Sequence, residues 1–70
     1  MNILILEDEI PAAEKLGAAI RRFDASIRVD GPLKSVREAV GWMKNHPAPD
    51  LIFADIQLAD GQSFAIFDAI

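Results

Sequence analysis

The stretch ILILEDE, residues 3–9, joins four consecutive apolar residues directly to three acids. An apolar run this short and rich in branched side chains predicts a strand that is buried on both faces, as in a parallel sheet. The adjacent carboxylates of Glu7, Asp8 and Glu9 repel one another at neutral pH. The stretch therefore predicts a central strand that ends where a cation is expected.

A helix signal follows this strand. Pro11 suits the first turn of a helix, and Arg21 and Arg22 suit its last turn because cations interact favourably with the helix dipole. Glu9 is interpreted as an acid of the first turn. The apolar positions recur at spacings of three and four, which predicts one buried face made of Ala13, Leu16, Ile20 and Phe23.

Two more strand and helix signals complete the pattern. Apolar runs at residues 27–29 and 51–54 predict strands, the first closed by Asp30, Gly31 and Pro32. The sequence SVRE, residues 35–38, is a capping box that begins a second helix, which ends before Pro47. Residues 59–61 predict a turn, and Ser63 is expected to cap a third helix with an apolar face of Phe64, Phe67 and Ile70. The order β-α-β-α-β-α indicates an α/β fold with a parallel sheet.

Composition narrows the class of protein. The chain has 70 residues, so residues 1–70 form one small domain at most. It contains no cysteine, which excludes disulfides and thiolate metal sites and fits a cytoplasmic location. The net charge of −4 gives no basic footprint for direct nucleic-acid contact, and no apolar run is long enough to span a membrane.

Three acids are expected to meet at one edge of the sheet. Glu7 and Asp8 follow the first strand, and Asp55 directly follows the third. If these strands are neighbours, the three carboxylates converge at the carboxyl ends of the strands, where open α/β sheets bind ligands. Mg²⁺ prefers such oxygen ligands, so we predict a magnesium site. Acids after a strand can also be plain loop or first-turn residues, and the lone Asp55 is what favours a site.

The motifs ILILEDE and PDLIFADIQLADGQSF around Asp55 resemble the receiver domain of two-component response regulators. The intervening GPLKSVREAVGWMKNHPAPD is similar to the receiver segment that leads into the third strand. The resemblance implies a flavodoxin-like fold with strand order 2-1-3 in this part of the sheet. It covers the whole chain and the first three βα units of the family's fold. The fourth and fifth strands are absent, so residues 1–70 are expected to be a truncated, partial receiver domain.

The resemblance also implies roles for individual residues. Asp55 is the phosphoacceptor, which receives a phosphoryl group from the phosphohistidine of a histidine kinase. Asp8 binds Mg²⁺ directly, Glu7 acts mainly through a metal-bound water, and the backbone carbonyl of Gln57 completes the protein ligands. The family's Thr or Ser and Lys, which contact the phosphoryl group, have no counterpart in this chain. The chain is thus expected to be a phosphoacceptor and not an enzyme with turnover.

The LADGQSF segment, residues 58–64, is similar to receivers coupled to LytTR-type DNA-binding domains. This implies control of transcription by an output domain outside this chain. An alternative is a Mg²⁺-dependent phosphohydrolase or phosphotransferase of the haloacid-dehalogenase-like class. The run Glu7-Asp8-Glu9 lacks the D-x-D spacing of that class.

A second alternative is a non-catalytic piece that only associates with itself. A sheet without a fourth strand leaves the third as an exposed apolar edge, which is prone to pair with another chain. We therefore predict that another copy covers this edge or the apolar helix faces beside it.

Three other residues are assigned structural roles: His46 near the end of the second helix, Trp42 as partly buried packing, and Ser63 as a cap.

Overall fold

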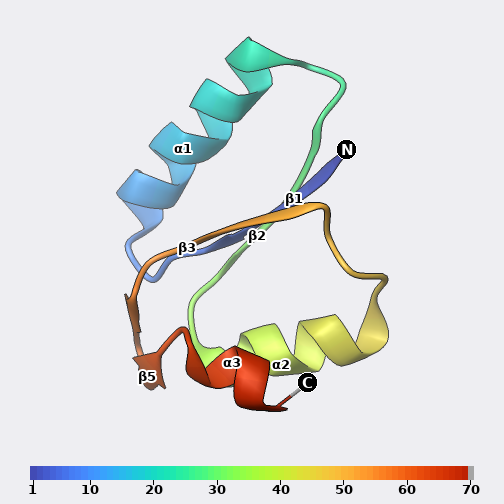
Figure 1. Ribbon diagram of the computed structural model, residues 1–70. Coiled ribbons are helices and arrows are strands. Elements are labelled where there is room, and N and C mark those ends of the chain that lie inside the picture. The colour runs from blue at the N-terminus through green and yellow to red at the C-terminus, as the bar shows by residue number, and fades with distance from the viewer. Residues whose placement is uncertain (70) are drawn as a thin grey trace.

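β1 (Asn2–Leu6) is the central strand of a three-stranded parallel sheet in the computed structural model, which describes residues 1–69 (Figure 1). β2 (Arg28–Leu33) and β3 (Leu51–Ala54) lie on either side of it. The sheet order β2-β1-β3 confirms the predicted strand order, and β3 is an edge strand. The predicted α/β architecture is therefore confirmed.

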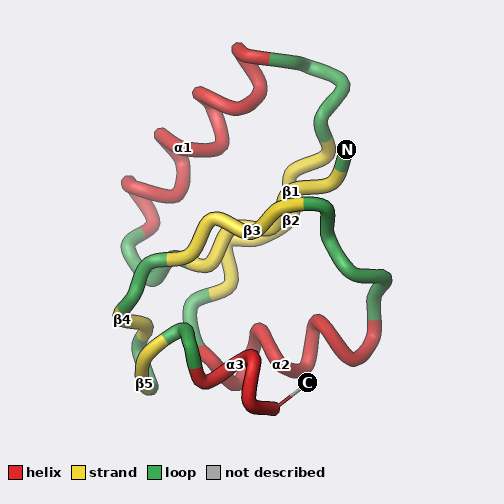
Figure 2. The backbone as a smooth tube through the Cα atoms, viewed as in Figure 1, coloured by secondary structure: helices red, strands yellow, loops and turns green. Residues whose placement is uncertain are grey.

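Helices cover both faces of the sheet (Figure 2). α1 (Ile10–Phe23) lies on one face, and α2 (Val36–Asn45) and α3 (Ala65–Ala69) lie on the other. α2 begins as its capping box predicts, because the Ser35 side chain accepts a hydrogen bond from the Glu38 N–H at 3.0 Å. No helix within residues 1–69 is both long enough and apolar enough to cross a membrane.

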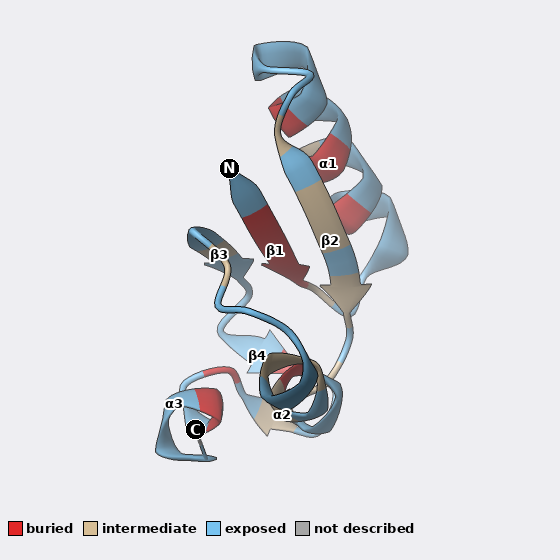
Figure 3. Cartoon of the chain, turned by 90° about the vertical axis from the view of Figure 1, so that its right-hand side faces the viewer, coloured by how far each residue is buried: buried red, intermediate tan, exposed pale blue. Residues whose placement is uncertain are grey.

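β1 divides the core into two clusters, because successive side chains of a strand point to opposite faces. Figure 3 colours most of β1 as buried, with further buried segments in α1 and α3. Ile3 and Ile5 pack toward α1, against Ala13 and Ile20. Leu4 and Leu6 pack on the opposite face in a cluster with Ala39, Leu58 and Ile66. All four β1 residues from Ile3 to Leu6 are at most 4% exposed, as the opening stretch predicts.

The structure corrects the predicted end of β2. The strand does not stop at Val29 but continues through Gly31 to Leu33. Gly31 has a φ of +97°, and a Cβ there would lie 2.5 Å from the carbonyl oxygen of Ile5. The close approach therefore requires glycine, and the register of β1 against β2 shifts at this point.

The region after Asp55 also differs from the prediction. A turn is confirmed at residues 59–60, but Gly61 already begins a strand, and the turn joins two short antiparallel strands, β4 (Gln57–Leu58) and β5 (Gly61–Gln62). Ser63 is buried, and its backbone carbonyl accepts the N–H of Ile66 at 3.1 Å, in place of the predicted side-chain cap.

Two predicted apolar faces were wrong in part. Phe23 is 87% exposed, because it lies in the last turn of α1, beyond the end of the sheet face. In α3 the core residue is Ile66, while Phe67 and Phe64, which precedes the helix, are exposed. Ile70, the third residue of that predicted face, lies outside the described residues.

Candidate functional site

The sheet itself holds Glu7 and Asp55 in place. Leu6 is in register with Ala54, so the next residue of each strand leaves the sheet at the same edge. The Asp55 N–H donates to the carbonyl of Leu6 at 3.0 Å, and the Glu7 N–H donates to the carbonyl of Leu33 at 2.9 Å. The backbones of both acids are thus tied to the neighbouring strands.

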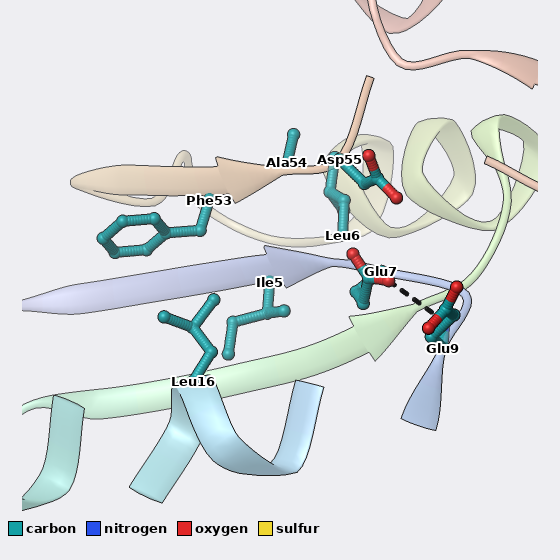
Figure 4. A pocket seen from close by; sticks show the side chains of 8 residues that line it. All are labelled: Ile5, Leu6, Glu7, Glu9, Leu16, Phe53, Ala54 and Asp55. Carbon is teal, nitrogen blue, oxygen red and sulfur yellow. Dashed lines mark hydrogen bonds between the residues drawn. The ribbon is translucent and has the colours of Figure 1, made fainter. Parts of the chain in front are cut away.

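The predicted convergence of acids is confirmed. Glu7, Asp8 and Asp55 each offer a carboxylate oxygen, and these oxygens all lie within 4.8 Å of one another. Glu7 is partly buried, whereas Asp8 and Asp55 are exposed. Figure 4 shows the carboxylates of Glu7 and Asp55 at the ends of β1 and β3.

The pKa of Glu7 is raised above its ordinary value. Desolvation of the carboxylate is the main cause, and the negative charges of Asp55, Asp8 and Glu9 act in the same direction. The Glu9 N–H opposes this shift by donating to Glu7 Oε1 at 3.2 Å. Among residues 1–69 the one ion pair joins Arg28 and Asp30, so no basic side chain forms a salt bridge with these acids.

A cavity of about 420 Å³ opens beside the acids (Figure 4). Its walls combine acidic and apolar side chains, from Ile5, Leu6, Glu7, Glu9, Leu16, Phe53, Ala54 and Asp55. Asp8 is not part of this lining, although its carboxylate belongs to the cluster. A small anionic group bound near Asp55 would have space here but would need a cation to offset the negative walls.

Glu9 differs from its predicted role. It occupies the position before α1, its side chain makes no capping hydrogen bond, and the first turn of α1 contains no acid. Its charge therefore adds to the acidic cluster, as the raised pKa of Glu7 reflects. Its nearness to Glu7 could have been expected from the sequence spacing alone.

The segment after Asp55 is held by backbone hydrogen bonds. The Ser63 N–H donates to the carbonyl of Ile56 at 2.8 Å, and Gln57 pairs with Gln62 in the β4-β5 hairpin. The structure thus orders the loop that carries Gln57. Coordination by the Gln57 carbonyl stays a prediction.

His46 and Trp42, which were assigned structural roles, are not part of the acidic cluster of Glu7, Asp8 and Asp55. The His46 ring stacks on Trp42 with 4.3 Å between ring centroids, and His46 Nδ1 lies 2.8 Å from the carbonyl oxygen of Trp42. Trp42 is partly buried, as predicted. It packs against the core cluster of Leu4, Leu6, Ala39, Leu58 and Ile66, called the Leu4 cluster below. His46 is exposed at the end of α2, as its interpretation implies.

Asp60 is a residue that the sequence analysis missed. Its carboxylate accepts hydrogen bonds from the backbone N–H groups of Val36 and Arg37 at the start of α2, at 2.6 and 3.1 Å. These bonds lower the pKa of Asp60, the Val36 contact most. The only signal in the sequence was the position of Asp60 in a turn.

The chain was compared with known protein families, curated proteins and solved structures. No family model, curated protein or solved structure matches the chain.

Proposed function

We propose that the chain is a receiver module of a two-component response regulator and accepts a phosphoryl group on Asp55. The observation that carries the proposal is the meeting of the Glu7, Asp8 and Asp55 carboxylates within 4.8 Å at the carboxyl ends of β1 and β3. A β2-β1-β3 parallel sheet with helices on both faces is compatible with the first part of a flavodoxin-like receiver fold. The sequence motifs supply the family and the residue roles.

In the proposed reaction, a carboxylate oxygen of Asp55 attacks the phosphorus of a phosphohistidine on a histidine kinase. An O–P bond forms, the P–N bond breaks, and the imidazole leaves with the electron pair. The exposure of Asp55 gives a partner protein access to this oxygen. The product is an aspartyl phosphate, which would control an output domain, by the resemblance a DNA-binding one of LytTR type.

The acidic cluster fits the ligand preferences of Mg²⁺. All three side chains offer carboxylate oxygens, which hard divalent cations prefer, and no basic side chain pairs with them among the described residues. In the proposed site Asp8 would bind the ion directly, Glu7 would act through a water, and the Gln57 carbonyl would complete the protein ligands. Bound Mg²⁺ would neutralise charge on the phosphoryl oxygens and align them for transfer.

The test is the intact mass of the protein after incubation with Mg²⁺ and a small acyl phosphate as donor. We expect the wild-type chain to gain one phosphoryl group and Asp55→Asn to gain none. Asp50→Asn is a matched control, because Asp50 precedes β3 at its opposite end, and this variant should be phosphorylated like wild type.

Three results would contradict the proposal or redirect it. No mass gain in wild type would contradict phosphoacceptor activity of this chain. A gain that persists in Asp55→Asn would assign the modification to another residue. Continuous release of phosphate from a phosphate ester would favour the alternative, a Mg²⁺-dependent phosphohydrolase.

A further inference from the structure

The loop after Asp55 is docked onto the start of α2 by a short segment, residues 58–60. Asp60 spans two backbone N–H groups there, with Oδ1 accepting from Val36 and Oδ2 accepting from Arg37. The N–H of Ala59 donates to the carbonyl of Lys34 at 3.2 Å. Three hydrogen bonds therefore join the loop to an earlier part of the chain: two reach the first turn of α2, and the third reaches Lys34 just before that helix.

α2 already has a local cap, so Asp60 is not needed to begin the helix. Ser35 accepts from the Glu38 N–H, and Glu38 Oε2 accepts in turn from the Lys34 N–H at 2.8 Å. The first N–H groups of a helix have no partner within the helix. Asp60 uses two that the capping box leaves free, which makes the contact a link between two segments.

The docked segment lies only a few residues from the candidate site. Leu58 belongs to the same segment. It is 2% exposed and packs in the core cluster with Ala39 and Ile66, so its burial also holds the segment in place. Only Ile56 and Gln57 separate Leu58 from Asp55, whose own N–H is bound to the sheet. The loop is thus fixed at both ends, with Gln57 between them.

We infer that Asp60 is a positioning residue, which holds the Gln57 carbonyl in place relative to Asp55 through the start of α2. The inference rests on the proposed function, since it assigns Gln57 a role in binding the cation. Groups that orient metal ligands typically change affinity by about 10–100-fold when they are removed. Because coupling between two equilibria is reciprocal, a bound cation should also protect the Val36 and Arg37 amides.

The test compares Asp60→Ala with Ser35→Ala. Both variants remove a side-chain cap of α2, but only the first releases the loop. Amide hydrogen exchange in metal-free protein is expected to be at least about 10-fold faster at Ala59 and Ser63 in Asp60→Ala. Ser35→Ala should leave these two amides as in wild type, and Leu4 in β1 should stay protected in both.

The second measurement is Mg²⁺ affinity by calorimetry on the same proteins. We expect a dissociation constant about 10-fold higher for Asp60→Ala and unchanged for Ser35→Ala. Asp60→Asn keeps one acceptor oxygen and should restore part of the affinity and of the exchange protection. If Asp60→Ala does not fold, Asp60→Asn provides the same comparison.

The outcomes separate this inference from the proposed function. Unchanged affinity in Asp60→Ala, or an equal loss in Ser35→Ala, overturns the positioning role. If wild type binds no Mg²⁺, the metal part of the proposed function fails. In that case faster exchange at Ala59 and Ser63 in Asp60→Ala still supports the link between loop and helix, and unchanged exchange overturns it.

Discussion

β1 and β3 have similar sequences and different surroundings. Both are short apolar strands that deliver an acid to the same edge of the sheet. The residues from Ile3 to Leu6 are at most 4% exposed, whereas Leu51 and Phe53 are 41% and 40% exposed. Within residues 1–69, β1 has a strand on each side, but β3 has one only on the β1 side. The comparison shows that one strand carries the core and the other carries mainly the candidate phosphoacceptor.

The largest expected effect is on the free energy of unfolding, when one apolar side chain is shortened in β1 and, for comparison, one in β3. Leu4→Ala should lower the free energy of unfolding by about 2–5 kcal/mol, because Leu4 is fully buried and the change leaves a cavity. Phe53→Ala should cost only roughly 1–2 kcal/mol, since Phe53 is already partly in water. Urea unfolding followed by Trp42 fluorescence measures both, because Trp42 packs against the Leu4 cluster.

A domain of this size has a total stability of about 4–10 kcal/mol, so Leu4→Ala is expected to leave a large unfolded fraction. Equal losses in the two variants would contradict the difference between the strands. Such a result would mean that the outer side of β3 is covered in solution by something that also buries Phe53.

The sequence predicted the elements whose signals are local. The apolar run of β1, the capping box at Ser35 and the stop of α2 before Pro47 all depend on neighbouring residues, and the structure confirms them. Parallel pairing then brings together the acids at the strand ends, so the convergence of Asp8 and Asp55 was also predictable.

The sequence could not predict features that depend on distant contacts. The continuation of β2 through Gly31 depends on a close approach to the Ile5 backbone. The role of Asp60 depends on N–H groups of α2 that precede it by more than twenty residues. Phe23 was expected to be buried because periodicity shows which side of a helix is apolar but does not show how far the sheet extends beneath it.

The second prediction concerns the outer edge of β3. Self-association, predicted from the sequence, would cover this edge and the apolar groove of about 310 Å³ beside it, lined by Met1, Ile3, Ala19, Ile20, Phe23, Ile27, Leu51 and Phe53. Asp50 and Asp55 flank β3 and would oppose antiparallel pairing of two copies, so we expect weak association. Leu51→Lys should shift the protein toward the monomer in light scattering over a range of concentrations, because a charged edge strand pairs poorly.

Phe67→Lys is the matched control for the edge, because it places the same charge on an exposed residue of α3, on the other face of the sheet. Loss of association in this variant alone would assign the contact to the helix face. A wild-type protein that is monomeric at every concentration would contradict self-association altogether.

The smallest expected effect is the pH dependence of stability that Glu7 produces. Its pKa is raised in the folded chain, so the folded state binds this proton more tightly than the unfolded state. Stability should therefore decrease as pH rises from the ordinary glutamate pKa, about 4.3, through the raised value. Asp24 and Asp60 have lowered pKa values, and their contribution is lost only at lower pH, as pH falls below about 4.

Glu7→Gln should remove this decrease, because a neutral side chain at the end of β1 has no charge to desolvate and is not repelled by Asp8 and Asp55. Thermal unfolding in chelator between about pH 4.5 and 7 measures the effect as the difference between the two proteins. Glu14→Gln, which removes a charge from an exposed position of α1, should keep the decrease seen in wild type. A wild-type curve parallel to that of Glu7→Gln would mean that the acids cost the fold nothing at neutral pH. The edge shared by β1 and β3 would then need no cation to be stable, and the main physical argument for a metal there would be lost.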